Sequence, residues 1–549
     1  MKELILERES KTNEVKFREW LERFLEEVVP LERSYALALW RANTTGRKDD
    51  EERLAKLEKS YRAVFANAQR YRFLKALDVE GSVQDPQLAR QLHLLRCEFE
   101  ASQMDDYTLS RMVALRVEVE STFNNFRAQL GEEKVPDNRL RELLRKSNSS
   151  DEVRAAWESS KQIGPIVAPK VLELVNLRNQ VARGLGYESW QRMALTLDEI
   201  DPTWLFALLD ELEAATQKPF EALKSRLDEG LAKRFGIKVS DLAPWHYGDP
   251  FFQSAPRTQA VDLDEFYTGK DLSALTTQFY DGLGLDIRPV LDQSDLFERD
   301  GKCQHAFCTD IDRRGDVRVL CNLKQNEQWM STMLHEFGHA VYDLCFEPNR
   351  PHFLRGPAHT LSTESIAMMF GRASKDRRFL EQVAHVDPAK AAGAAASAVA
   401  ELRAEQLIFV RWAMVVVRFE DALYRDPAQP LDTLWWDLVE RFQLLRRPEG
   451  RHAPDWATKI HIATSPVYYQ NYILGELMAS QLLRHLLEKV AGERSDAGVG
   501  ALMNRREVGE FLRQSIFRPG KSYPWNEMLE RACGRKLEVS HFLAEVTGK

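Results

Sequence analysis

The sequence predicts a mainly α-helical protein with one short β-hairpin. Apolar residues recur at helical spacing along most of the 549 residues, and alternating, strand-like runs are scarce. No internal repeat or low-complexity linker divides the chain, so we expect one large domain over residues 1–549, built of two lobes. Its internal connections are the Pro- and Gly-bearing loops at 244–256, 347–357, 446–455 and 517–524.

Long amphipathic helices are expected at the N-terminal end, over residues 12–75. Glu, Arg and Lys are dense there, beside apolar stripes such as Leu31 and Tyr35. The stretch from Lys390 to Phe419 is rich in alanine and then apolar, which predicts a buried helix. Helical spacing also fits residues 86–130, 137–146, 150–160, 168–185 and 203–235.

One segment breaks the helical pattern. Alternating apolar residues run from His305 to Ile311 and from Val317 to Asn322, on either side of a turn that contains Gly315. This pattern predicts a short β-hairpin. The edge of such a hairpin is a natural place to align an extended peptide through main-chain hydrogen bonds.

The segment after the hairpin carries the most informative motif, His335-Glu336-Phe337-Gly338-His339. Apolar residues recur around it at helical spacing, and no proline follows Asn326 until Pro348. Residues four apart lie on the same face of a helix, so both imidazoles can reach one metal ion. Glu336 lies beside them and can take a proton from metal-bound water. The alternative is two core histidines that happen to be four residues apart.

A catalytic zinc site needs a third protein ligand and one position for water. Glu364 follows His339 by 25 residues, in a second helical segment with Ser362 or Thr363 as its cap. Two His and one Glu are the ligand set of a broad class of zinc peptidases, so we predict one Zn²⁺ per chain. The alternative is that Glu364 is an ordinary acidic residue of a first helical turn.

Composition excludes several classes of partner. The net charge of −8 is modest and the two signs are interspersed, so no nucleic-acid surface is expected. No apolar run is long enough for a bilayer, and the N-terminus lacks a secretory signal, so we expect a cytoplasmic protein that does not contact a membrane. The six cysteines are expected to be reduced thiols, with Cys303 and Cys321 as the pair to test for a bridge.

Several short motifs resemble those of angiotensin-converting enzyme and its relatives, the peptidyl-dipeptidase A family. The matches keep the same order along most of the chain, which makes them more specific than the zinc motif alone. They are Cys303-Gln-His305-Ala306, Arg355-Gly-Pro-Ala, Glu364-Ser-Ile-Ala, Asp455-Trp-Ala-Thr-Lys459-Ile-His461-Ile, Tyr468-Tyr-Gln-Asn-Tyr472 and Gly520-Lys-Ser-Tyr-Pro-Trp525.

The resemblance implies a zinc peptidase that releases dipeptides from the C-termini of short peptides. It makes His335, His339 and Glu364 the zinc ligands, and Glu336 the general base and later the acid. It further implies a monomer with a deep central cleft, with zinc at the floor and the N-terminal helices, about 12–130, as a lid.

The resemblance also assigns residues that bind the substrate. His461 and Tyr472 match the donors to the oxyanion of the tetrahedral intermediate. Gln253, Lys459 and Tyr469 match the trio that binds the C-terminal carboxylate of the peptide. The hairpin residues that hydrogen-bond the substrate backbone correspond to His305 and Ala306.

The chain departs from the family at three places. Aligning the tyrosines requires one extra residue after His461, so Tyr468 competes with Tyr469 for the carboxylate. Asn471 stands where animal enzymes carry a chloride-binding arginine, which argues against chloride activation. Met368 stands where the family often has an aspartate that orients a zinc histidine, so the orienting group is left unassigned.

Two rival functions remain open at this point. A zinc oligoendopeptidase of the thimet-oligopeptidase type shares the zinc motif, the mainly helical fold and the spacing to the third ligand, and it would cleave without needing a terminal carboxylate. A catalytically inactive peptide-binding protein would be expected to have lost part of the zinc set or Glu336, and neither loss is seen.

Overall fold

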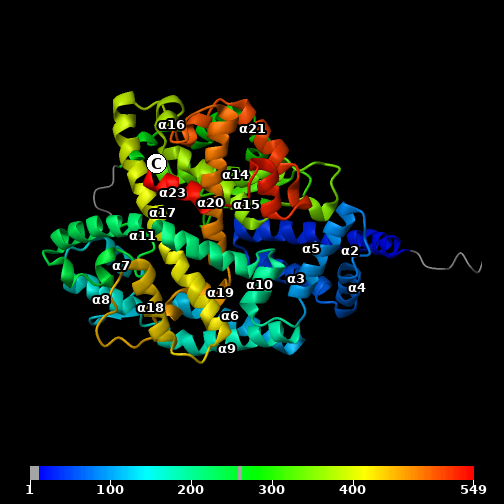
Figure 1. Cartoon of the computed structure of the whole chain (residues 1–549), viewed down its shortest axis with the longest axis horizontal. Helices are drawn as coiled ribbons and strands as arrows, with labels where there is room; N and C mark the ends of the chain where they lie inside the picture. Colours follow the sequence, from blue (N-terminus) through cyan, green and yellow to red (C-terminus); the bar gives the residue numbers. More distant parts are fainter. Residues whose placement is uncertain (1–11, 257–261, 549) are drawn as a thin grey trace, which may run out of the picture. The chain divides into compact units, whose positions relative to one another are not determined.

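The computed structural model describes residues 12–256 and 262–548. Helices make up most of these residues (Figure 1), and the described strands form two antiparallel two-stranded sheets. This confirms the mainly α class and the short β-hairpin. None of the described helices combines the length and the apolar character required to cross a membrane.

The chain divides into two compact units, each assembled from three separate segments. Unit 1 comprises Met1–Gln103, Asp262–Ala395 and Met478–Leu537, and unit 2 comprises Met104–Val261, Ala396–Leu477 and Glu538–Lys549. Two helices, α17 (Pro388–Arg425) and α20 (Tyr469–His485), contribute residues to both units. The single catalytic domain, its cleft and its lid stay predictions.

Unit 1 holds the predicted motif helix and the hairpin. Its N-terminal helices are α2 (Asn13–Thr45), α3 (Lys48–Phe65), α4 (Ala68–Val79) and α5 (Pro86–Ala101). The middle segment contributes α12 (Leu272–Gly282), α13 (Arg288–Leu291), β3 (Phe307–Asp310), β4 (Val317–Leu320), α14 (Glu327–Leu344), α15 (Thr360–Gly371) and α16 (Arg377–Gln382), and the last adds α21 (Arg506–Leu512) and α22 (Trp525–Cys533).

Unit 2 is built around long buried helices. Asp201 caps α11 through hydrogen bonds from the backbone of Thr203 and Trp204, and Gly236 ends it with a φ of 66°. The elements of this unit, apart from α17 and α20, are α6 (Asp106–Asn125), β1 (Ala128–Leu130), β2 (Glu133–Val135), α7 (Asp137–Lys146), α8 (Ser150–Ser160), α9 (Gly164–Gly184), α10 (Trp190–Leu197), α11 (Pro202–Phe235), α18 (Leu431–Gln443), α19 (Ile460–Thr464) and α23 (Val539–Thr547).

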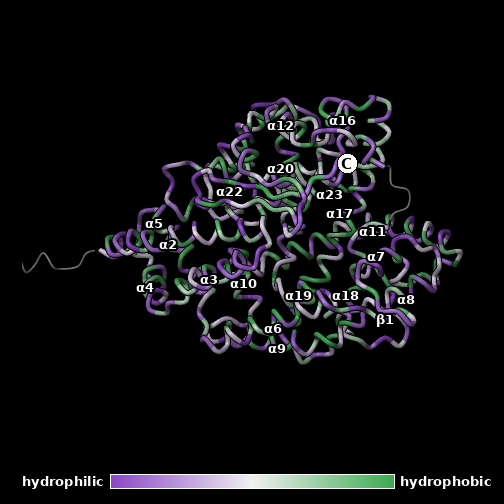
Figure 2. The backbone as a smooth tube through the Cα atoms, turned by 180° about the vertical axis from the view of Figure 1, so that it is seen from behind, coloured by the Kyte–Doolittle hydropathy of each residue, from purple (hydrophilic) through white to green (hydrophobic). Residues whose placement is uncertain are grey.

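Most predicted helices are confirmed, with a few shifts at their ends. These helices could be predicted because apolar and polar residues alternate along them, as amphipathic helices require (Figure 2). The prediction for 86–130 was wrong in part: the chain breaks after α5, and residues 128–130 form strand β1. The reason is a local turn at Gly131, with a φ of 59°, that pairs β1 with β2.

The β3–β4 hairpin is held by its own turn and by a third segment. Asp310 at the end of β3 accepts hydrogen bonds from the backbone of Asp312 (3.1 Å) and Arg313 (2.7 Å). On the other side of β4, the Asp295 backbone donates to Val319 and accepts from Cys321, each at 2.9 Å. Within the described chain β4 is therefore the inner strand and β3 the edge strand.

Candidate metal centre and anion site

Helix α14 fixes the two motif histidines on one face. The Asn326 side chain accepts a hydrogen bond from the Trp329 backbone at 2.9 Å and so starts the helix where the sequence predicts. Met330, Met333 and Leu334 are fully buried and anchor the opposite side in the core of unit 1. His335 and His339 follow at a spacing of one turn, which points both rings the same way.

Gly338 allows the third ligand to approach. Helix α15 packs along α14, and a Cβ atom at Gly338 would lie only 2.9 Å from the Cα atom of Ala367. Any larger residue would push the two helices apart, which would move Glu364 away from the histidines. The glycine inside the motif thus has a packing role that its spacing in the sequence does not reveal.

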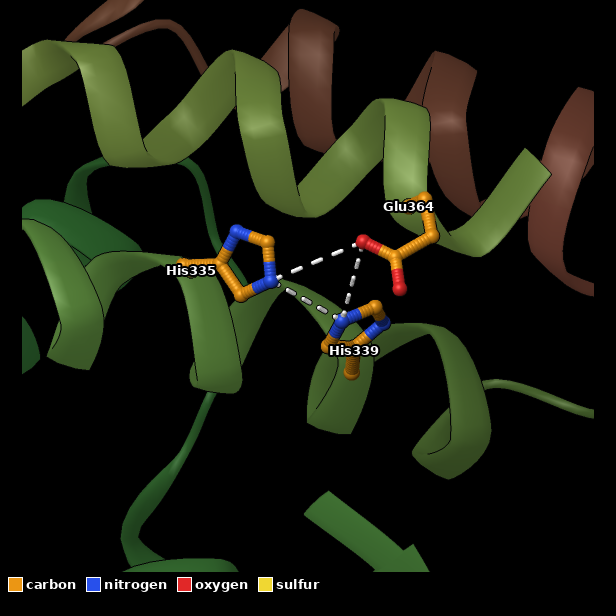
Figure 3. Close-up of side chains that lie close together, drawn as sticks. All are labelled: His335, His339 and Glu364. Atoms are coloured by element: carbon orange, nitrogen blue, oxygen red, sulfur yellow. Dashed lines mark hydrogen bonds and ion pairs between the residues drawn. The ribbon is translucent and has the colours of Figure 1, made fainter. Parts of the chain in front are cut away.

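The three predicted ligands face one another from α14 and α15 (Figure 3). The two Nε2 atoms of His335 and His339 lie 3.2 Å apart, and Glu364 Oε2 lies 3.7 Å and 3.9 Å from them. Tetrahedral zinc with bonds of about 2.0–2.1 Å separates its ligand atoms by about 3.3 Å. The side chains present therefore fit a zinc ion with only small adjustments.

The group that orients His339 is Thr363. Its Oγ1 atom lies 2.7 Å from Nδ1 of His339, which leaves Nε2 of the ring directed at the other ligands. We expected Ser362 or Thr363 to cap α15, and this was wrong, because the helix begins at Thr360 with His359 as its cap. Thr363 thus fills the role that Met368 cannot, and only its position directly before Glu364 could have suggested it.

Burial keeps the metal ligands in the form that binds metal. It lowers the pKa of His335 to about 4, and burial together with the charge of His335 lowers the pKa of His339 to about 3. Both imidazoles are therefore neutral near pH 7, as metal coordination requires. Burial also raises the pKa of Glu364.

Glu336 is a buried carboxylate with an unusually high proton affinity. Burial, reinforced by the charge of Glu364, raises its pKa to about 8, and a hydrogen bond from the Cys308 backbone opposes the rise. A carboxylate with a pKa near the working pH can both take up and return a proton. The contact with Cys308 also brings the base next to strand β3.

His305 and Ala306 lie directly before the edge strand β3. His305 is exposed and Ala306 is half-buried, and neither belongs to the strand that begins at Phe307.

The six cysteines are free, so the candidate pair Cys303 and Cys321 forms no disulfide bond. All these residues belong to unit 1.

A second polar cluster lies in unit 2 and joins two of the predicted carboxylate-binding residues. The ammonium group of Lys459 donates to Oε1 of Gln253 at 2.8 Å, although 206 residues separate them. The amide nitrogen of Gln253 in turn donates to Oδ2 of Asp249 at 3.1 Å, which fixes the direction of the amide. We call Gln253, Lys459 and Tyr469 the anion site.

Lys459 is a buried cation whose charge no acid neutralises directly. Its side chain is about nine-tenths buried, and among the described residues it forms no ion pair. The rings of Phe251, Trp412 and Tyr469 lie around it, with centroids 5.4, 5.6 and 5.6 Å from Nζ. Burial lowers its pKa to about 8, against the attraction of Asp249. Such a site favours an added anion.

Tyr469, of the two competing tyrosines, turns its ring toward Lys459. Tyr469 is buried, whereas Tyr468 is half-buried and stacks edge-on against Tyr472 at 5.2 Å. The rings of His461 and Tyr472 both pack against the ring of Tyr469, each with its centroid 5.4 Å from the Tyr469 centroid. The structure thus gathers Gln253, Lys459, Tyr469, His461 and Tyr472 within unit 2.

His461 is neutral and half-buried. Burial, with the charge of Lys459, lowers its pKa to about 4. Its Nδ1 atom is buried and has no hydrogen-bond partner among residues 12–256 and 262–548. A neutral imidazole can still donate one hydrogen bond, as the predicted role requires.

Comparison with known proteins places the chain beside one family of peptidases. A family model described as angiotensin-converting enzyme matches residues 11–235 and 254–545. Gln253 lies one residue outside this match, so its assignment rests on the resemblance and on its bond to Lys459.

Individual relatives are distant. The angiotensin-converting enzyme of Rattus norvegicus is 23% identical over 429 residues, which cover 72% of this chain and 32% of that protein. The enzyme of Haematobia irritans exigua is 23% identical over 51% of this chain and 46% of its own length. Thermostable carboxypeptidase 1 of Pyrococcus furiosus is 23% identical over 72% of this chain and 76% of its own. The chain thus spans less than half of the two converting enzymes.

Proposed function

The chain belongs to the angiotensin-converting enzyme family, and on this basis we propose that it is a zinc peptidase that releases dipeptides from the C-termini of short peptides. The observation that carries the choice of the C-terminus is Lys459, a buried cation without an acidic partner in the described chain. A free peptide carboxylate is the natural anion for it, with Gln253 and Tyr469 as neutral donors.

The catalytic groups of unit 1 support hydrolysis. Zinc held by His335, His339 and Glu364 would polarise the scissile carbonyl and the attacking water. Glu336, beside the ligand His335 on α14, would accept the water proton and return it to the leaving amine. The edge strand β3, with His305 and Ala306 before it, provides a sheet edge along which an extended peptide would align.

His461 and Tyr472 are assigned to the oxyanion by their match to the family positions. A neutral His and a Tyr are both suitable hydrogen-bond donors. Support from unit 2 is that both lie against Tyr469, and hence next to the group that would hold the end of the peptide.

The length of the released product separates the proposal from its nearest neighbour. The name of the Pyrococcus furiosus relative is carboxypeptidase, so removal of single residues is the second candidate. The thimet-type oligoendopeptidase and the inactive binding protein are not favoured by the family match. We propose the dipeptide because the motifs around His461 and Tyr472 follow the converting-enzyme pattern.

The experiment is mass spectrometry of the products from an octapeptide with a free C-terminus and from its C-terminally amidated twin. We expect serial loss of two residues from the free acid, little cleavage of the amide, and loss of activity after chelation that zinc restores. Serial loss of single residues would replace the dipeptidase with a carboxypeptidase. Equal internal cleavage of both peptides would overturn the C-terminal assignment.

We further propose that the protein is a monomer and binds one Zn²⁺. We also propose that it needs no chloride, because Asn471 is buried at the position of the family's chloride-binding arginine. Light scattering would give the oligomeric state, and turnover in acetate against chloride buffers would test the halide. The cytoplasmic location stays a prediction.

A further inference from the structure

The chain between Lys459 and Tyr472 carries four of the assigned residues, and we call it the His461 segment. It starts at Lys459, passes through α19 and then turns sharply into α20, which begins at Tyr469. Lys459 and His461 lie before the turn, and Tyr469 and Tyr472 lie after it. The geometry of the turn therefore decides how the two pairs face one another.

The turn is built on a strained residue, Val467. Its φ is 56°, in the left-handed region, although valine is β-branched and avoids this region more strongly than most residues. The side chain is 8% exposed, so the residue is held inside unit 2. A strained conformation of this kind persists only where the surroundings impose it.

Both backbone groups of Val467 are bound by buried side chains. Its N–H donates to Oε1 of Glu420 at 3.0 Å, and its carbonyl accepts from Nε2 of Gln470 at 2.6 Å. Further back, the guanidinium of Arg178 donates to the carbonyl of Ala463 at 2.7 Å. Glu420 and Gln470 are 2% exposed and Arg178 is 4% exposed.

Glu420 is the member of this set whose chemistry is least explained by folding alone. It lies on α17, and the one hydrogen bond that its buried side chain makes in the described chain is the bond from the Val467 N–H. Burial raises its pKa to about 8, against the hydrogen bond from Val467 and the charge of Arg178. Burying an acid is costly, and a leucine would fill the same space without that cost.

We propose that Glu420 is a positioning residue that holds Val467 in its left-handed conformation and so sets the orientation of His461 against Tyr469 and Tyr472. The effect on turnover rests on the proposed function, whereas the hold on Val467 does not. Since a carboxyl oxygen and an amide oxygen can both accept from the Val467 N–H, a glutamine at 420 would serve equally well, but a side chain without an acceptor would not.

The experiment compares Glu420→Met with Glu420→Gln, which have nearly the same length and differ in the acceptor. Two readouts are used: hydrogen exchange of a peptide covering residues 463–469, and kcat and KM for a free-acid peptide. In Glu420→Met we expect faster exchange at Val467 and a loss in kcat/KM on the order of 100-fold, with zinc content unchanged. In Glu420→Gln both should stay within a few-fold of the parent.

A second substitution tests the strain itself. Glycine adopts positive φ without penalty, so adding Val467→Gly to Glu420→Met should recover at least tenfold of the lost kcat/KM. Asn179→Ala is the matched control, because Asn179 is buried beside Arg178 and donates to the Tyr424 carbonyl of α17 at 2.8 Å, and within the described chain its side chain makes no hydrogen bond to the His461 segment. It should lower the melting temperature and leave exchange over 463–469 unchanged.

The outcomes separate the two proposals. Unchanged exchange at Val467 in Glu420→Met would overturn the inference, and so would faster exchange with unaltered kinetics. If the parent protein cleaves no peptide, the proposed function fails, yet faster exchange in Glu420→Met with normal exchange in Glu420→Gln would still support the hold on Val467. Loss of kcat/KM in Glu420→Gln equal to that in Glu420→Met would also overturn it.

Discussion

Units 1 and 2 each assemble a buried polar cluster, but they do so in different ways. In unit 1 the ligands come from two packed helices, and two of the three are four residues apart. In unit 2 the anion site joins a loop residue, Gln253, to Lys459 and Tyr469, and the first two lie 206 residues apart. Helical geometry fixes the positions of the side chains in the first cluster. In the second cluster, side-chain hydrogen bonds to loop segments fix them.

The difference lies in what supports each cluster. A regular helix places His335 and His339 correctly whatever surrounds it, and Gly338 then sets the distance to α15. The residues of the anion site depend on side chains that bind irregular backbone, such as Asp249, whose Oδ1 accepts from the Phe251 backbone at 2.8 Å while its Oδ2 accepts from the Gln253 amide. We therefore expect unit 1 to supply the metal ligands and the general base, and unit 2 to hold the C-terminal carboxylate of the peptide.

The largest effect should come from Glu336→Gln in unit 1. An amide cannot accept the water proton, so kcat should fall on the order of 1000-fold while zinc content, measured by mass spectrometry of metals, stays at one per chain. Glu327→Gln, at the start of the same helix, is the matched control and should retain activity. Retained turnover in Glu336→Gln would show that unit 1 does not supply the general base through Glu336.

Lys459→Met should be next, and it should change binding more than chemistry. Loss of a charge-assisted hydrogen bond worth about 1.5–3 kcal/mol raises KM for a free-acid peptide on the order of 100-fold and leaves the amidated peptide unaffected. Lys224→Met is the control, because Lys224 is also a buried lysine of unit 2 but has its own acid, Asp228. A fall in kcat alone would contradict the division of roles.

Thr363→Val tests the metal centre without touching a ligand. The change keeps the shape but removes the oxygen that lies 2.7 Å from Nδ1 of His339, so zinc affinity should fall about 10-fold to 100-fold. Competition with a chelator measures the change. Thr363→Ser retains the hydroxyl and should bind zinc as the parent does; equal weakening in both variants would rule out the orienting role.

The smallest effect expected is a pH dependence confined to the anion site. Lys459, with its pKa lowered to about 8 by burial, is charged below pH 8 and loses its proton above it. The KM for the free-acid peptide, relative to that for the amide, should therefore rise about tenfold by pH 9. Lys459→Arg stays charged and should abolish the rise. A ratio that is flat in the parent would exclude Lys459 as the carboxylate partner.

The elements that could be predicted from the sequence are those whose residues recur at a regular helical spacing. Helices α7 and α8 begin and end as predicted, and the structure brings together the predicted ligands His335, His339 and Glu364. Prediction failed where no period exists: strand β1 has three residues, too few to show alternation. The role of Thr363 was also missed, because a hydroxyl near a helix start looks like a cap until the neighbouring helix is placed.

The anion site could be predicted from the sequence only in part. Helical or strand spacing cannot connect Gln253 with Lys459, because nothing local relates residues so far apart, and the resemblance alone suggested the pair. The choice between Tyr468 and Tyr469 needed the structure, since it depends on which side chain the start of α20 turns toward Lys459. The strain at Val467 leaves no mark in the sequence at all.

The interleaving of the two units has a consequence for how the protein is made. The chain passes between units five times, and unit 1 is complete only when residues up to Leu537 are present. The predicted metal ligands, all made by residue 364, must therefore wait for nearly all of translation before their surroundings can close. Neither unit can be produced as an uninterrupted fragment, and a ribosome that stalls late would release a chain with both units unfinished.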